Sequence, residues 1–145
     1  MNNPNDFFVI YSNAILLKDK ILMKSIYKGN ICLFDVWNSF STIGKSSLSV
    51  MIDNWFVSIV KEKVNVMFSN IETLTDTMYA FSNCIIQFHA FSEEGNELRH
   101  IKERMTICLN MENNEWLVLN SINLYQLKLI LVQAFLNRRN YLTTA

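Results

Sequence analysis

The chain has 145 residues, a length that suits one domain able to bury about two-thirds of its unfolded surface. Apolar residues make up 50% of the sequence and charged residues only 18%, which favours extra hydrophobic surface in a pocket or a subunit interface. Thirteen basic and thirteen acidic residues cancel, so no overall electric field recruits nucleic acid or an anionic membrane surface.

The first helices are predicted from capping signals. Asn3 is a candidate N-cap, Pro4 suits the first helical position, and a helix from there extends to Lys18. Asp19 can cap a second helix over residues 20–27, which the following Gly-Asn pair ends. Together these segments predict a helical hairpin.

A short strand and a loop follow the hairpin. Residues 31–35 form an apolar run that ends at Asp35, and the loop over residues 36–44 carries Trp37 and Phe40 among small polar residues. Aromatic side chains in a loop need a structural or functional reason, so Trp37 and Phe40 are candidate pocket residues.

A third helix is predicted from residue 46 onward, because apolar residues recur there at helical spacing along one face. The stripe consists of Leu48, Met51, Ile52, Trp55, Phe56 and Ile59. Trp55 and Phe56 are either core residues or part of a ligand pocket.

Beyond residue 63 the apolar pattern changes to period two, with many β-branched and aromatic residues, which predicts strands. Turn-forming clusters separate four long runs, so the strands form an antiparallel meander that the third helix covers on one face. The predicted strands span residues 64–73, 77–91, 97–111 and 115–125.

Residues 127–136 are apolar nearly all round, which is typical of a short buried helix and too short for a membrane span. We therefore predict one domain over residues 1–145, with a core over about residues 4–125 and a C-terminal helical tail over 126–145.

The three cysteines are odd in number, far apart and in apolar contexts, so they predict reduced core thiols and neither a disulfide framework nor a zinc site. His89 and His100 have no partners at metal-ligand spacing. The N-terminal residues lack the pattern of an export signal. We expect a cytoplasmic protein without metal, cofactor, nucleic-acid or membrane partners.

The order of elements resembles the ketosteroid-isomerase, SnoaL-like and nuclear-transport-factor-like superfamily, over roughly residues 4–125. Single residues at the family's spacing are Tyr11, Tyr27, Asp35 and Gly44. The segment from Arg104 to Leu109, followed by a turn and Trp116-Leu117-Val118, is similar to the SnoaL-like pattern R-x-T-x-x-L, turn, W-x-I/V.

This resemblance implies an α+β fold in which three N-terminal helices pack in a strongly curved antiparallel sheet, a cone-shaped α+β barrel. In ketosteroid isomerases the aspartate at the position of Asp35 moves a proton, and the tyrosine at the position of Tyr11 donates to the developing oxyanion. Thr106 stands where those enzymes have a second, acidic donor, and Asn123 where they have a pocket aromatic. Any chemistry would therefore be a variant.

Each candidate also has a structural alternative. Asp35 can simply cap the turn after its strand, and Tyr11 can be a core tyrosine with a hydrogen-bonded hydroxyl. Arg104 and Glu103 point to opposite faces of a strand. If Arg104 faces inward, it can pair with Asp35 or hold an anionic ligand; otherwise it is a solvated or interface charge.

Two functions remain open from the sequence. The first is a pocket for a small hydrophobic or anionic ligand, with isomerase-, cyclase- or hydratase-like acid–base chemistry by Asp35 and Tyr11. Its ligand-binding candidates are Trp37, Phe40, Trp55, Phe56, Arg104, Thr106 and Asn123. The second is a non-catalytic dimerisation or scaffold module whose own side chains fill the pocket. Both include a homodimer through the sheet face.

Overall fold

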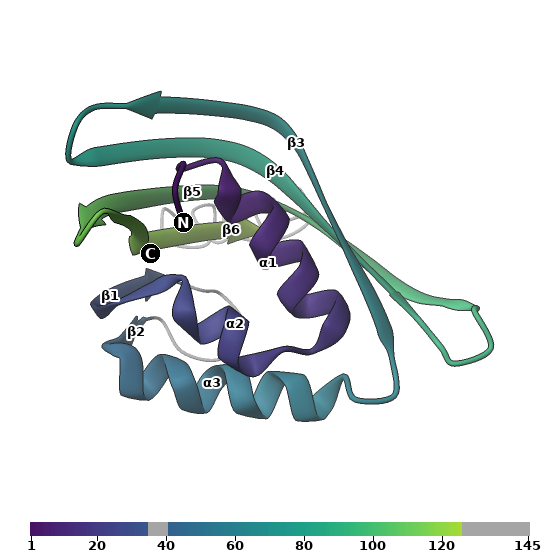
Figure 1. The fold of residues 1–145 in the computed structure, drawn as a ribbon. Coiled ribbons are helices and arrows are strands. Elements are labelled where there is room, and N and C mark those ends of the chain that lie inside the picture. The colour runs from purple at the N-terminus through teal and green to yellow at the C-terminus, as the bar shows by residue number, and fades with distance from the viewer. Residues whose placement is uncertain (35–40, 126–145) are drawn as a thin grey trace, which may run out of the picture.

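The computed structural model describes residues 1–34 and 41–125. Within these ranges it contains three helices and six strands (Figure 1). In chain order they are α1 (Asp6–Leu17), α2 (Lys20–Ser25), β1 (Tyr27–Phe34), β2 (Thr42–Ile43), α3 (Lys45–Ser58), β3 (Lys63–Thr75), β4 (Tyr79–Phe91), β5 (Glu97–Glu112) and β6 (Glu115–Tyr125). The α+β class agrees with the prediction. The predicted tail helix lies outside the described residues.

The N-terminal turn before α1 differs in detail from the prediction. The helix begins at Asp6 with Asn5 as its N-cap, and the Asn3 side-chain oxygen accepts a hydrogen bond from the Asn5 N–H at 2.8 Å. The Asp6 carboxylate accepts the backbone N–H groups of Asn2 and Asn3, each at 2.9 Å. Asn3 and Pro4 therefore build the turn that precedes the helix.

The second helix is shorter than predicted. Asp19 caps it as expected, accepting the Leu22 N–H at 2.9 Å, but the helix ends at Ser25 and Tyr27 already begins β1. Strand pairing explains the difference, because Tyr27 lies opposite Val118 of β6 and the Val118 N–H donates to the Ile26 carbonyl at 2.8 Å. Long-range pairing overrides the local helical signal there.

The strands form one sheet in the order β2-β1-β6-β5-β4-β3. Neighbours are antiparallel except β1 and β6, which are parallel. The sheet curves strongly around the helices (Figure 1). It is not a closed barrel: among the described strands, β2 and β3 are edges that do not pair with each other, and the helices fill the open side.

The middle of β3 contains an irregularity that bends the strand. The pairing of β3 with β4 shifts register between Ser69 and Glu72, and Asn70 has a φ of 53°. Asparagine tolerates this left-handed conformation better than most residues. A bulge of this kind increases the local twist and bends the strand, which helps the sheet to curve around α1.

The stripe predicted for the third helix is confirmed, and it faces two different surroundings. Leu48, Ile52, Phe56 and Ile59 are buried in the core, whereas Met51 and Trp55 are only partly buried. On α1, an aromatic cluster joins the helix to β3, with the Phe8 and Phe68 rings 5.0 Å apart. Core packing thus fixes α1 and α3 relative to the sheet.

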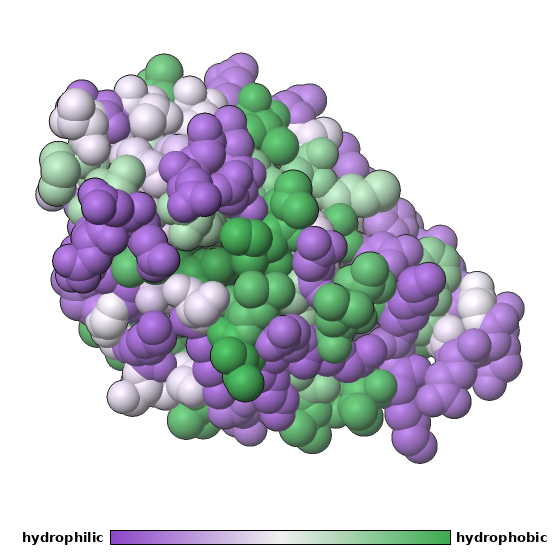
Figure 2. All heavy atoms as spheres, in the orientation of Figure 1, coloured by the Kyte–Doolittle hydropathy of each residue, from purple (hydrophilic) through white to green (hydrophobic). Residues whose placement is uncertain are grey.

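On the face of the molecule shown in Figure 2, apolar side chains gather in a band across the middle, with polar side chains on both sides. The exposed apolar residues of the helices include Val9, Leu17, Ile21 and Val57. On the same side, the Lys24 ammonium of α2 contacts the Asp53 carboxylate of α3 at 2.7 Å. Within residues 1–34 and 41–125, no helix is long and apolar enough to cross a membrane.

Candidate functional site

A pocket of about 970 Å³ lies between the helices and the inner face of the sheet. Its lining comes from all three helices and all six strands described in the structure, so the fold as a whole shapes it. A cavity of this volume is at the upper end of the range that holds drug-sized molecules.

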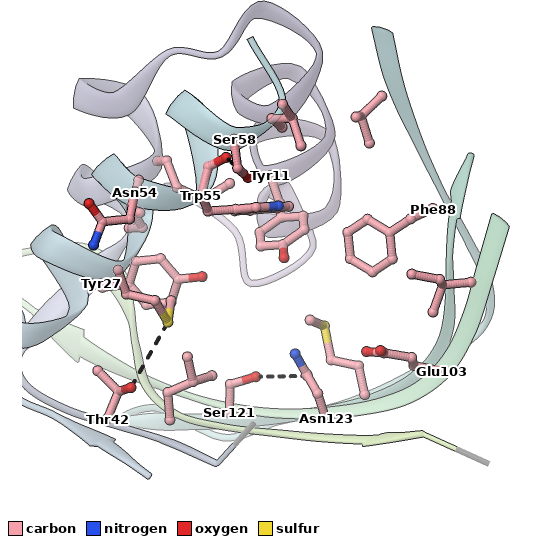
Figure 3. A pocket seen from close by; sticks show the side chains of 18 of the residues that line it. Tyr11, Tyr27, Thr42, Asn54, Trp55, Ser58, Phe88, Glu103, Ser121 and Asn123 are labelled. Atoms are coloured by element: carbon pink, nitrogen blue, oxygen red, sulfur yellow. Dashed lines mark hydrogen bonds between the residues drawn. The ribbon is translucent and has the colours of Figure 1, made fainter. Parts of the chain in front are cut away.

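Polar groups from four elements point into this pocket (Figure 3). Tyr11 of α1 and Tyr27 at the start of β1 direct their hydroxyl groups into it, and Glu103 of β5 directs its carboxyl group into it. On β6, the Ser121 hydroxyl donates to the Asn123 side-chain oxygen at 3.4 Å. Among Tyr11, Tyr27 and Glu103, the glutamate is the most deeply buried, since it is only 2% exposed.

The walls between these polar groups are apolar and rich in aromatic rings. Trp55 of α3 and Phe88 of β4 face each other edge to face, with ring centroids 6.3 Å apart. Met51 and Met105 line the same space, and the Thr42 hydroxyl contacts the Met51 sulfur at 3.9 Å. An apolar body with few polar substituents fits a pocket of this composition.

A charged pair lies at the rim of the pocket. Arg99 of β5 lines the pocket although its side chain is 49% exposed, and its guanidinium donates to both carboxylate oxygens of Glu62 at 3.0 and 2.6 Å. This two-point geometry is the strongest form of an arginine–carboxylate contact. The guanidinium is therefore already neutralised.

Strand alternation on β5 places Glu103 inside. Successive side chains of a strand point to opposite faces, so Glu103 shares its face with Met105, Ile107 and Leu109, all of which are buried. Arg104 lies on the other face and is exposed. Two adjacent residues of β5 thus place a carboxyl group in the pocket and a cation on the solvent-exposed face.

The predicted site residues divide into three groups. Tyr11, Trp55 and Asn123 line the pocket. Phe56 is 1% exposed within the core and does not line it. Asp35, Trp37 and Phe40 lie outside the described residues, so their predicted roles stay predictions.

Arg104 and Thr106 are corrected by the structure. Both have even positions on β5 and lie on its outer face, away from the pocket. The Thr106 hydroxyl donates to the Asn83 side-chain oxygen of β4 at 2.7 Å, a contact across the outer face of the sheet. Neither side chain can contact a ligand in this pocket, because the sheet lies between them and it.

The sequence prediction did not assign Glu103, Tyr27 or Ser121 to the site. A signal for Glu103 is present in the sequence, because the apolar residues of β5 occupy odd positions from Ile101 to Leu109 and Glu103 has the same parity. Tyr27 matches a family motif, but it was predicted to end the second helix. Because it begins β1 instead, its position beside the pocket was not predicted.

No group of three or more histidine, cysteine, aspartate or glutamate residues in the described parts of the chain has the geometry to hold a metal ion. Burial raises the pKa of the Cys84 thiol to about 11. Cys84 therefore stays a protonated core residue at neutral pH, which removes it as a candidate nucleophile.

Comparison of the sequence with family models and with curated proteins finds no match. Solved structures do match. Aln2 from a Streptomyces species superposes with a TM-score of 0.77 at 8% identity, over 90% of this chain and 91% of that one. An NTF2-like protein of unknown function from Pseudomonas putida gives 0.71 at 13% identity, over 86% and 92%.

A cystatin-like fold protein from Caulobacter vibrioides gives a TM-score of 0.70 at 12% identity, over 92% of this chain and 94% of that one. The chain therefore has the α+β fold of NTF2-like and cystatin-like proteins, as the sequence resemblance implied. At these identities the comparisons establish the fold and no shared activity.

Proposed function

We propose that this chain is a small-molecule pocket protein, which binds a compact and mainly apolar ligand between its helices and the inner face of its sheet. The observation that carries the proposal is the pocket of about 970 Å³ into which a buried carboxyl group and two tyrosine hydroxyls converge. Apolar walls supply most of the binding energy, and the few polar groups orient the ligand.

The same geometry supports an acid–base function of the kind predicted for Asp35 and Tyr11. Tyr11 supplies a hydroxyl inside the pocket, and Glu103 supplies a carboxyl group on the facing sheet. A carboxyl group can transfer a proton, and a phenol can stabilise a developing negative charge. Glu103 thus joins Asp35 as a candidate for the proton-transferring group.

A pair of adjacent residues on β6 tests ligand binding. Ser121 faces the pocket and is 3% exposed, whereas Ile122 faces outward and is 36% exposed. The measurement is saturable binding of the neutral fluorescent probe N-phenyl-1-naphthylamine. We expect Ser121→Phe to weaken saturable binding because the ring occupies part of the cavity beside the ligand, and Ile122→Phe to leave binding unchanged.

Thermal unfolding of both variants verifies that they are folded. Failure of the wild-type chain to bind the probe, or equal binding by wild type and a folded Ser121→Phe variant, would contradict the pocket proposal. A self-filled pocket, as in the scaffold alternative, predicts the first of these results.

The second candidate function is dimerisation through the outer face of the sheet, and a specific surface favours it. Large apolar side chains are exposed there on three strands: Phe34, Tyr79, Phe81, Ile122 and Leu124. Phe34 lies opposite Ile122 in the sheet, and Phe81 lies opposite Cys108, so these side chains share one surface. An apolar surface of this kind is typical of an interface.

We propose a homodimer that buries this face, with a total interface above about 1,200 Å². Sedimentation velocity at micromolar concentration tests it. The double substitution Phe81→Arg and Ile122→Arg should convert the dimer to a monomer, because it places four charges in the interface. Ile21→Arg, on an exposed apolar residue of α2, is the matched control and should leave the dimer intact. A monomeric wild-type chain would exclude this proposal.

A further inference from the structure

Two aromatic side chains meet in the pocket from opposite walls. Trp55 belongs to α3 and Phe88 to β4, and both line the cavity (Figure 3). Each is only partly buried, whereas Phe56, the next residue of α3, is 1% exposed. Core packing therefore covers Phe56 and leaves part of the Trp55 and Phe88 rings uncovered beside the cavity.

The two rings form a corner. Their centroids are 6.3 Å apart and their planes meet at 77°. A third ring that lies parallel to one of them is therefore steeply inclined to the other. Aromatic rings attract one another in an offset-stacked or an edge-to-face arrangement, so this third ring can make one favourable contact of each kind. The corner thus offers a flat aromatic ligand two contacts at once.

Methionine side chains add to the apolar lining. Met51 lies one helical turn before Trp55 on α3, and Met105 of β5 lines the cavity from the sheet. Thioether groups are polarisable and contact aromatic rings favourably, and the unbranched side chain adapts to the shape of its neighbour. These contacts, like those of the rings, do not depend on the charge of the ligand.

A saturated ring system with the same carbon skeleton suits the corner less well. It is thicker than a flat ring, because hydrogen atoms project from both of its faces, and it has no π electrons to take part in stacking. Burial of apolar surface alone would not penalise it, since its apolar surface is at least as large. A preference between the two kinds of ring therefore reports the aromatic contacts and not hydrophobicity in general.

We propose that the pocket selects flat aromatic ligands over saturated ones, and that Trp55 and Phe88 determine this specificity. The aromatic part of the ligand lies in the corner between the two rings, parallel to one of them. This inference rests on the proposed binding function and names the chemical class of the ligand.

Two neutral alcohols with the same fused-ring skeleton test the inference on the wild-type chain. The first is 2-naphthalenemethanol, which is flat and aromatic, and the second is decahydro-2-naphthalenemethanol, which is saturated. Both carry the same hydroxymethyl group, so hydrogen bonds to the hydroxyl do not distinguish them. Isothermal titration calorimetry measures their dissociation constants. We expect the aromatic alcohol to bind about tenfold more tightly, because two aromatic contacts add to the burial of apolar surface.

Two variants assign this preference to its residues. Trp55→Leu and Phe88→Leu each replace a ring by an aliphatic side chain, so each should reduce the preference to about threefold or less while retaining binding of the saturated alcohol. Phe91→Leu is the matched control and should leave the preference unchanged, because it makes the same substitution on the same strand at a residue that does not line the pocket. Thermal unfolding verifies that the variants are folded.

The outcomes separate this inference from the pocket proposal. Equal or tighter binding of the saturated alcohol by the wild-type chain would overturn the inference and leave the pocket proposal intact. Folded Trp55→Leu and Phe88→Leu variants that both keep the full preference would also overturn it. Absence of binding for both alcohols would overturn it as well, and binding of N-phenyl-1-naphthylamine then decides whether the pocket proposal survives. The wild-type comparison decides the inference even if a variant fails to fold.

Discussion

The two faces of β5 have opposite characters although they share one backbone. On the inner face, Met105, Ile107 and Leu109 are all 3% exposed or less. On the outer face, Arg104 is exposed and Thr106 is half-buried. The inner face packs against helices, whereas the described helices leave the outer face uncovered.

This difference identifies Glu103 as an exceptional residue. An ionisable side chain among buried apolar neighbours lowers stability unless its charge is compensated, so buried Glu103 is a candidate residue of the proposed site. Arg104 needs no such explanation, because a charge on an outer face is solvated. An ionisable side chain is therefore notable on the inner face of the sheet and ordinary on the outer face.

The largest expected effect is on the free energy of unfolding, and it is measured by truncating one leucine on each face of β5. Leu109 is 0% exposed on β5 and Leu98 is 50% exposed on the same strand. Leu109→Ala should lower the free energy of unfolding by about 2–5 kcal/mol, because it leaves a cavity. Leu98→Ala should change it by less than about 1 kcal/mol. Urea denaturation measures the free energy of unfolding of both variants. Similar losses of stability would contradict the difference in burial between the two faces.

The reactivity of two cysteines compares the two faces of the sheet in the wild-type protein, without any substitution. Burial raises the pKa of inward-facing Cys84 from 9.0 to about 11, and it also raises the pKa of half-buried Cys108 on the outer face. Only the thiolate reacts with iodoacetamide, so at about pH 8 the thiolate fraction of Cys84 is about a hundredfold below that of an ordinary thiol.

We therefore expect Cys108 to be alkylated well before Cys84 in the native protein, as followed by peptide mass spectrometry. The Cys84 rate should continue to rise with pH up to about 11. Alkylation of both residues at equal rates in denaturant is the control. A faster reaction at Cys84 in the native state would show that its side chain is accessible.

The smallest effect is expected from an outward-facing charge pair. A hydrogen bond from Lys24 is the main cause that holds the pKa of Asp53 below its usual value of 3.8, with attraction by Lys24 and Lys20 adding to it. A lowered pKa stabilises the fold above the unfolded-state pKa, and this contribution is lost as the pH falls through the folded-state value.

Asp53→Asn should therefore lower the thermal midpoint slightly at neutral pH and make no difference at about pH 2, where wild-type Asp53 is protonated as well. Differential scanning calorimetry at the two pH values makes this comparison. A loss as large as that of Leu109→Ala would mean that the link between α2 and α3 matters more than an exposed pair should.

Most of the fold is predictable because its signals are local and repeated. The stripe from Leu48 to Ile59 predicts α3, and the period-two runs predict the four long strands within a few residues. The exceptions depend on contacts between distant parts of the chain. Tyr27 belongs to β1 because it pairs with Val118, and β2 is too short to leave a pattern.

The site is predicted less completely, for a related reason. Of the predicted residues, Tyr11, Trp55 and Asn123 line the pocket. The prediction also includes Arg104 and Thr106 on the outer face of β5, and it omits Glu103, which lines the pocket. A family resemblance gives an approximate position, whereas strand geometry requires the correct parity, and a shift of one residue exchanges the two faces. The apolar odd positions of β5 provide that parity within the sequence itself.

The bulge at Asn70 has a consequence for how this protein can change. The irregularity of β3 lies in the backbone, at the left-handed conformation of Asn70 and the shift in its pairing with β4, and Asn70 is not one of the residues that line the pocket. The fold itself tolerates wide changes of sequence, since Aln2 superposes with a TM-score of 0.77 at only 8% identity. We therefore expect substitutions in the lining to change what the proposed pocket binds while the fold persists, which directed evolution of the lining residues would test.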